Sequence, residues 1–189
     1  MTDAPEPRLA PLPSDEWDDD VLAALHRAFP DKIVDRFVTE GAPTAIGTML
    51  HHPALAGPWL EYNNVLLWEP ALDHRLRELM VLRVAHRTGS VYEWGQHVRL
   101  AQRYGVTDDD VAAIASAQVD RSRFTPLEAT LLRATDELLE DSRVSDATWA
   151  RLAEHLDARQ LVEVVFVVGT YTCLAMVFNS FGLVLDPEV

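Results

Sequence analysis

Between Arg77 and His97 the chain reads RELMVLRVAHRTGSVYEWGQH, and this stretch decides the fold. Apolar residues recur at helical spacing in its first half, and Thr88-Gly89 then interrupts the pattern. A second helical pattern begins directly after the glycine. The stretch therefore predicts two helices, Ala71–Arg87 and Val91–Tyr104, joined by a tight turn.

Two ionisable side chains, Glu78 and His97, lie at the same depth in this predicted hairpin. Glu78 is nine residues before Arg87, and His97 is seven residues after Ser90. At about 1.5 Å of rise per residue, both lie roughly 10–13 Å from the turn. In an antiparallel pair of helices the carboxyl group and the imidazole can therefore meet.

The surroundings of Glu78 are apolar, because Val81, Leu82 and Ala85 follow it on the same helix face. A carboxyl group placed there must find a partner or accept a proton, and we expect burial to raise its pKa towards that of histidine. His97 and His74 are the candidate partners. A shielded Glu–His pair can pass protons near neutral pH, as enolisation, decarboxylation through an enolate and lactone opening require. A core histidine with a structural carboxylate partner explains the same pattern.

Ser90 and Glu93 lie on the helix face of His97, which makes them possible neighbours of the site. The spacing Ser-x-x-Glu is also that of a capping box, in which each side chain bonds to the other residue's backbone amide. We expect capping to be their main role. Tyr92 and Trp94 complete the possible site neighbours, and packing is their expected function.

The rest of the chain also predicts helices, and no segment shows the alternation of a half-buried strand. Further helices are expected over Trp17–Ala28 (capped by Ser14 or Asp15), Lys32–Glu40, 43–51, 53–67, the segment after Thr107, 126–141, 146–155 and the segment after Asp157. The prediction is an all-α fold with a single helical domain over residues 17–189. Residues 1–16, with four prolines, are expected to form a flexible N-terminal arm.

The final helical segment carries no charge from Val164 to Leu185, a length that could span a bilayer. Polar residues interrupt it and acidic residues follow it, without a basic anchor. We therefore expect a central core helix or an oligomer interface rather than a membrane span. In the hairpin, four arginines are expected to form a solvated face, at which Arg87 could attract an anion: Arg75, Arg77, Arg83 and Arg87.

Composition narrows the expected partners. The chain has 189 residues and a formal net charge of −14. Such a surface repels nucleic acid phosphates and anionic membranes, so a small molecule is the expected partner. The first residues do not form a secretory signal, and we expect a cytoplasmic protein of bacterial type. The single cysteine, Cys173, excludes an internal disulfide and is expected to be buried and unreactive.

Three motifs carry a family resemblance: Arg77-Glu78-Leu-Met-Val-Leu, Tyr92-Glu93-Trp94-x-x-His97-x-x-Leu-Ala101 and Gly105-Val-Thr. They resemble the carboxymuconolactone decarboxylase and alkylhydroperoxidase D-like superfamily, most strongly over residues 70–115. The final helix with Tyr171 also fits this resemblance. It implies an all-helical fold that assembles as a homo-oligomer of two, three or six chains, with sites near subunit contacts.

The chain departs from the peroxidase branch of that superfamily. That branch has a Cys-x-x-Cys pair ahead of the histidine, and Ser90 and Glu93 occupy those two positions here. Neither can form a thiolate, so thiol peroxidase activity of that type is not expected. The thiol-free decarboxylase branch implies His97 as proton donor or acceptor and Glu78 as its partner.

Three hypotheses follow. The first is an enzyme without metal or cofactor that uses His97 and Glu78 on a small lactone, carbonyl or carboxylate compound. The second is a non-catalytic oligomeric binding or scaffold protein with the same fold. The third is a redox role for Cys173. No residue pattern specifies the substrate.

Overall fold

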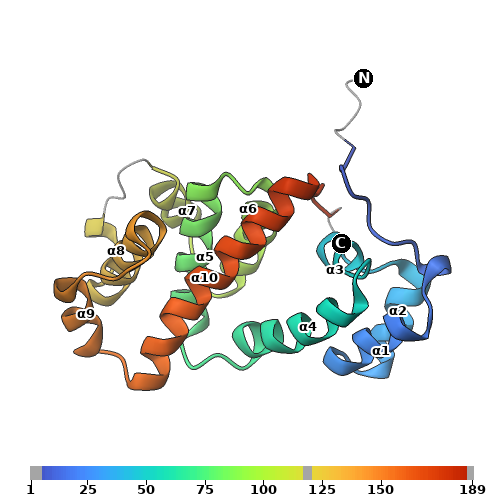
Figure 1. Ribbon diagram of the computed structural model, residues 1–189. Coiled ribbons are helices and arrows are strands. Elements are labelled where there is room, and N and C mark those ends of the chain that lie inside the picture. Colours follow the sequence, from blue (N-terminus) through green and yellow to red (C-terminus); the bar gives the residue numbers. More distant parts are fainter. Residues whose placement is uncertain (1–5, 117–120, 187–189) are drawn as a thin grey trace. The chain divides into compact units, whose positions relative to one another are not determined.

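The computed structural model describes residues 6–116 and 121–186, and all regular structure within them is helical, which confirms the all-α prediction (Figure 1). The chain consists of two compact units. The first contains Met1–Glu69 with Ser180–Val189, and the second contains Pro70–Asn179.

The first unit contains four α-helices that enclose a small apolar core. They are α1 (Asp19–Ala28), α2 (Asp31–Glu40), α3 (Thr44–Met49) and α4 (Pro53–Trp68). The core consists of Val21, Leu25, Val34, Phe37, Leu50, Ala56 and Leu60. Helix α1 begins later than predicted, because the Asp18 carboxylate accepts the Val21 amide and so caps it in place of Ser14 or Asp15.

The predicted N-terminal arm is attached to this unit. The Arg8 amide donates to the Phe181 carbonyl (2.8 Å) and the Leu12 amide to the Gly47 carbonyl (3.0 Å). A Cβ atom at position 47 would lie 2.8 Å from the Pro11 Cβ, so this approach requires glycine. Residues 1–5 of the arm lie outside the described residues.

The second unit is built around the predicted hairpin. Its helices are α5 (His74–Thr88), α6 (Val91–Arg103), α7 (Asp108–Ile114), α8 (Pro126–Asp141), α9 (Asp146–Ala153) and α10 (Ala158–Phe181, whose last two residues belong to the first unit). The predicted caps Thr107, Thr125 and Ser145 are confirmed. Gly89 ends α5 with a φ of 65°, a left-handed conformation that suits glycine and allows the immediate start of α6.

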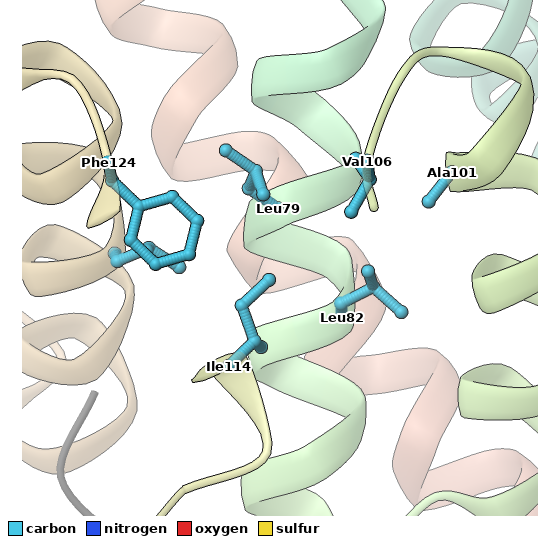
Figure 2. Close-up of a cluster of buried hydrophobic side chains, with 7 residues drawn as sticks. Leu79, Leu82, Ala101, Val106, Ile114 and Phe124 are labelled. Carbon is cyan, nitrogen blue, oxygen red and sulfur yellow. The ribbon is translucent and has the colours of Figure 1, made fainter. Parts of the chain in front are cut away.

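Helix α5 is the centre of this unit, and every residue from Arg77 to Ala85 is buried. Figure 2 shows its Leu79 and Leu82 side chains among residues of the surrounding elements. The whole cluster comprises Leu79, Leu82, Ala101, Val106, Ile114, Phe124 and Leu132. A helix enclosed in this way places its polar side chains in the interior.

Two of the hairpin arginines are therefore buried, and the predicted solvated face is wrong for them: Arg77 is 0% and Arg83 1% exposed. Arg83 donates to the Asp136 carboxylate (2.7 Å) and to the carbonyl of Ile114 (2.8 Å). Arg87 is also paired, with Asp136 and Glu140 of α8. The signal in the sequence was the run Leu79–Leu82, because four successive apolar residues cover every face of a helix.

Helix α10 follows the full length of the hairpin. Near its start, the Glu163 carboxylate accepts the backbone amides of Ala71 and Leu72, just before α5. Near its end, the Asn179 amide donates to the Thr88 carbonyl, at the end of α5. These contacts make α10 parallel to α5. The helix is long and apolar enough to cross a membrane, but half of its most apolar stretch is buried, as in a core helix.

Candidate acid–base site

Glu78 of α5 and His97 of α6 meet as the helical spacing predicts. The His97 Nδ1 atom lies 2.7 Å from the Glu78 Oε2 atom. Glu78 is 0% exposed, whereas the His97 side chain retains 12% exposure. The pair therefore has one fully enclosed member and one that partly reaches the surface.

Arg77 holds the other oxygen of the same carboxylate. Its Nε atom lies 2.9 Å from the Glu78 Oε1 atom. The Arg77 guanidinium is also 5.7 Å from the centre of the Tyr104 ring, a cation–π arrangement. We expected Arg77 on a solvated face, and the structure makes it a direct member of the site.

His74 contacts this arginine and not Glu78. The His74 Nδ1 atom lies 3.1 Å from the Arg77 Nη1 atom, and its ring stacks on Tyr104 with centres 4.5 Å apart. His74 thus contacts Arg77, and the expectation that it could pair with Glu78 is not met. The guanidinium lies between them.

The pKa of Glu78 moves in the opposite direction from the prediction. Burial raises the pKa of this carboxyl group, but His97 and Arg77 outweigh burial, and the pKa is lowered overall. Glu78 is therefore a carboxylate at neutral pH and can only accept hydrogen bonds. It follows that Nδ1 of His97 is the donor in the pair, and Nε2 is the nitrogen left for chemistry.

The predicted capping box at Ser90 and Glu93 is wrong. Ser90 makes no side-chain capping bond, and its ψ of 94° differs from the 160° of Thr125, where a capping box does form. Both side chains are buried, and neither the Ser90 hydroxyl nor the Glu93 carboxyl has a hydrogen-bond partner among the described residues. Burial raises the pKa of Glu93 to about 9.

Aromatic residues of α6 and α10 pack near the site. The Tyr171 ring of α10 meets the His97 ring edge to face, with centres 5.0 Å apart. Tyr92 packs against Phe178 of the same helix, also at 5.0 Å. Trp94 packs against the apolar cluster of α5 and lies 5.9 Å from the His86 ring. The predicted packing roles of Tyr92 and Trp94 are confirmed, and Tyr171 is the additional contact of His97.

Other candidate features lie away from this pair. A cavity of about 440 Å³ is lined by residues of α8, of α9 and of the segment after α9, among them Arg133, Arg151 and His155, and it does not include Glu78 or His97. Cys173 is exposed on α10, so the expectation of a buried thiol is wrong. Within residues 6–116 and 121–186, no three His, Cys, Asp or Glu side chains are grouped to hold a metal ion.

Comparison with known proteins gives a family match over part of the chain and a fold for nearly all of it. Residues 53–137 match the carboxymuconolactone decarboxylase family, and this range contains α5, α6 and the whole Glu78–His97 pair. No curated protein matches the chain.

Solved structures match over nearly the full length. A peroxidase-related protein of Silicibacter sp. TM1040 is 16% identical with a TM-score of 0.75, covering 100% of this chain and 96% of that chain. An alkylhydroperoxidase AhpD core protein of Ralstonia eutropha JMP134 is 18% identical with a TM-score of 0.73, covering 95% and 94%. The apo form of the debrominase Bmp8 is 14% identical with a TM-score of 0.67, covering 94% and 91%.

These identities are too low to transfer an activity. The TM-scores establish the fold. The family match at residues 53–137 covers all three sequence motifs, the first two of which lie on the hairpin. Residues 53–137 are therefore similar to the carboxymuconolactone decarboxylase family, and the chain has the fold of the alkylhydroperoxidase D-like structures.

Proposed function

We propose that the protein is a cofactor-independent enzyme that moves protons on a small lactone, carbonyl or carboxylate compound. One observation carries this proposal: the Glu78 carboxylate is held by Arg77 on one oxygen and by His97 Nδ1 on the other. This arrangement supports the proposal because it orients the imidazole and leaves its second nitrogen, Nε2, to accept a proton.

The proposed chemistry is proton abstraction next to a carbonyl group. His97 Nε2 takes the proton, the carbon–hydrogen bond breaks, and its electron pair moves to the carbonyl oxygen as an enolate. Glu78 stabilises the imidazolium that forms, and Arg77 keeps Glu78 ionised. The proton then moves to another carbon of the substrate, or it leaves to solvent and a solvent proton replaces it on the enolate, so the step needs no oxidant or reductant.

The cost of the arrangement supports a functional role. Charged groups such as Arg77 and Glu78, both 0% exposed, lose several kcal/mol of hydration on burial. Replacement of such pairs by apolar residues is often neutral or stabilising, so stability alone is a weak reason for their presence. An oriented imidazole at the end of the pair supplies a stronger reason.

A non-catalytic scaffold is the second candidate, and two observations favour it. Both oxygens of Glu78 are already bonded, and the cavity described above lies elsewhere. In this alternative the Arg77–Glu78–His97 network fixes the packing of α5 against α6 and reacts with nothing.

Proton exchange distinguishes the two candidates without knowledge of the natural substrate. The purified protein is incubated in deuterium oxide with a set of β-keto acids, unsaturated γ-lactones and small ketones, and loss of the α-proton signals is followed by proton NMR. We expect accelerated exchange or decarboxylation of at least one compound, and a loss of about 100-fold or more in His97→Ala.

The controls separate the site from general damage to the protein. His52→Ala changes an exposed histidine of the first unit and should leave the rate unchanged. Glu78→Gln should lower the rate, because it removes the charge that stabilises the imidazolium. Rates unchanged in both His97→Ala and Glu78→Gln would disprove the mechanism, and no reaction with any compound class would favour the scaffold.

A further inference from the structure

The Glu93 side chain is buried without a structural role in the described part of the chain. The residue is 1% exposed, and neither carboxyl oxygen has a hydrogen-bond partner. A buried polar group without a partner costs roughly 1–3 kcal/mol, so each one requires an explanation. The capping role that would have explained this residue is absent.

The position of Glu93 connects it to the proposed site. It lies four residues before His97 on α6, which places the two Cβ atoms on one helix face, about 5–6 Å apart. Ser90, with a buried hydroxyl that also has no partner in the described chain, continues this face. Three polar side chains in succession thus line one side of α6, at positions 90, 93 and 97.

The environments of Glu78 and Glu93 separate their protonation states. Glu78 faces Arg77 and His97 and is ionised. For Glu93, burial is the cause that raises its pKa, and no charged group offsets it. Among the elements around α6, α5 contributes Arg77 and Glu78 to the site, and α10 carries no charged residue after Glu163. Two carboxyl groups with opposite shifts are the usual sign of one acid and one base.

We propose that Glu93 is a neutral carboxylic acid that donates its proton to the substrate oxygen on which negative charge develops. His97 transfers the proton at the reacting carbon. This assignment rests on the proposed function and deepens it. It also defines the substrate class: a carbonyl compound that reacts through an enolate, and one that can carry a carboxylate of its own, because a neutral Glu93 does not repel an anion.

The atoms balance for decarboxylation of a β-keto acid. The bond to the carboxylate carbon breaks, carbon dioxide leaves, and the electron pair reaches the carbonyl oxygen, which takes the proton of Glu93. The carbon of the resulting enol then takes a proton from protonated His97, and the enol oxygen returns its proton to Glu93. One proton from solvent restores His97, and the net reaction consumes one proton.

The first part of the test needs no substrate. Infrared spectra of the full-length protein at pH 7.5 should contain the carbonyl band of a protonated carboxylic acid. That band should be lost in Glu93→Gln. It should persist in the matched control Glu128→Gln, because Glu128 is also buried but has a lowered pKa from its bonds to Thr125 and Arg75, which outweigh burial. Absence of the band from the wild type, or its survival in Glu93→Gln, would overturn the assignment whether or not the protein is an enzyme.

The second part uses the compound that reacts in the exchange assay. Glu93→Gln should lower kcat about 100-fold or more, Glu93→Asp should restore part of it, and the high-pH decline of the wild-type rate should be absent from the Gln variant. An active wild type with an equally active Glu93→Gln variant overturns proton donation and leaves the proposed function intact. A wild type that shows the band but reacts with no compound overturns both proton donation by Glu93 and the proposed function. If Glu93→Gln does not fold, Glu93→Asp carries both measurements, through a shifted band and a changed pH profile.

Discussion

Glu78 and Glu93 are both buried on the facing helices of one hairpin, yet their pKa values move in opposite directions. Burial acts on both carboxyl groups in the same sense. The difference comes from the partners, because Glu78 is bonded to Arg77 and His97 and Glu93 has no partner among the described residues. Two side chains of the same type therefore carry different charges at neutral pH: Glu78 is ionised and Glu93 is neutral.

Stability should fall with rising pH because of Glu93. Below about pH 4.5 this group is protonated in the folded and the unfolded chain, and between about 4.5 and 9 it is protonated in the folded chain alone. Unfolding then releases a proton, so each pH unit in this window lowers the free energy of unfolding by up to ~1.4 kcal/mol. Glu93→Gln lacks this dependence and should melt at a higher temperature than the wild type at pH 8.

The measurement is a series of thermal melts from pH 5 to pH 9. The advantage of Glu93→Gln should shrink towards pH 5, where the wild-type carboxyl group is favourably protonated. Parallel curves for the two proteins across this range would show that Glu93 is ionised in the folded state.

Glu78→Gln should have the opposite effect. The ionised Glu78 stabilises the fold above its unfolded pKa of about 4.5, and this contribution is lost as the pH falls through its lower folded pKa. Removal of one partner from a buried ion pair costs about 3–5 kcal/mol, because Arg77 keeps its charge. Urea denaturation at pH 7 should therefore show a much less stable variant, and the difference should narrow below pH 4.5. An equally stable variant at pH 7 would mean that the Arg77–Glu78 pair contributes no net stability.

Arg83 should be essential for stability and irrelevant to chemistry. Its guanidinium bonds Asp136 and the Ile114 carbonyl from a position 1% exposed, so Arg83→Ala should lower the free energy of unfolding by about 3 kcal/mol. Arg143→Ala is the control, because the Arg143–Asp146 pair is on the surface, with the Arg143 side chain 72% exposed. That change should stay within about 0.5 kcal/mol. Similar losses in the two variants, measured by urea denaturation, would contradict the structural role of Arg83.

The hairpin and its central pair could be predicted because they depend on local rules. Helical periodicity, the glycine at position 89 and equal distances from the turn are sufficient to bring Glu78 and His97 together. Helix boundaries set by caps were also predictable at Thr107, Thr125 and Ser145.

Two features of the site could not be predicted because they depend on tertiary packing. Ser90-x-x-Glu93 has the same pattern as Thr125-x-x-Glu128. The backbone at Ser90 turns differently, however, and the Ser90 hydroxyl does not bond to the Glu93 amide. The burial of Arg77 likewise depends on Tyr104 and on helices distant in the sequence. Local pattern fixes which residues share a face, and packing decides which of them are charged.

Self-association through α10 is the remaining prediction. Four apolar side chains lie exposed along this helix: Val162, Val165, Phe166 and Met176. The helical spacing of Val162, Val165 and Phe166 continues to Gly169. A Cβ atom at Gly169 would meet nothing within 4 Å, so a second helix can approach closely there. The stripe lies on the helix whose opposite face holds Tyr171 against His97. We therefore expect a second copy of the chain to cover it.

Light scattering should give a wild-type mass of at least twice the 21.2 kDa of one chain. Phe166→Glu should shift the distribution towards the monomer, because association would bury an unpaired charge. Trp149→Glu, which changes an exposed aromatic residue of α9 outside the stripe, should leave the mass unchanged. A monomeric wild type would refute the prediction, and equal masses for Phe166→Glu and the wild type would place the interface on another face.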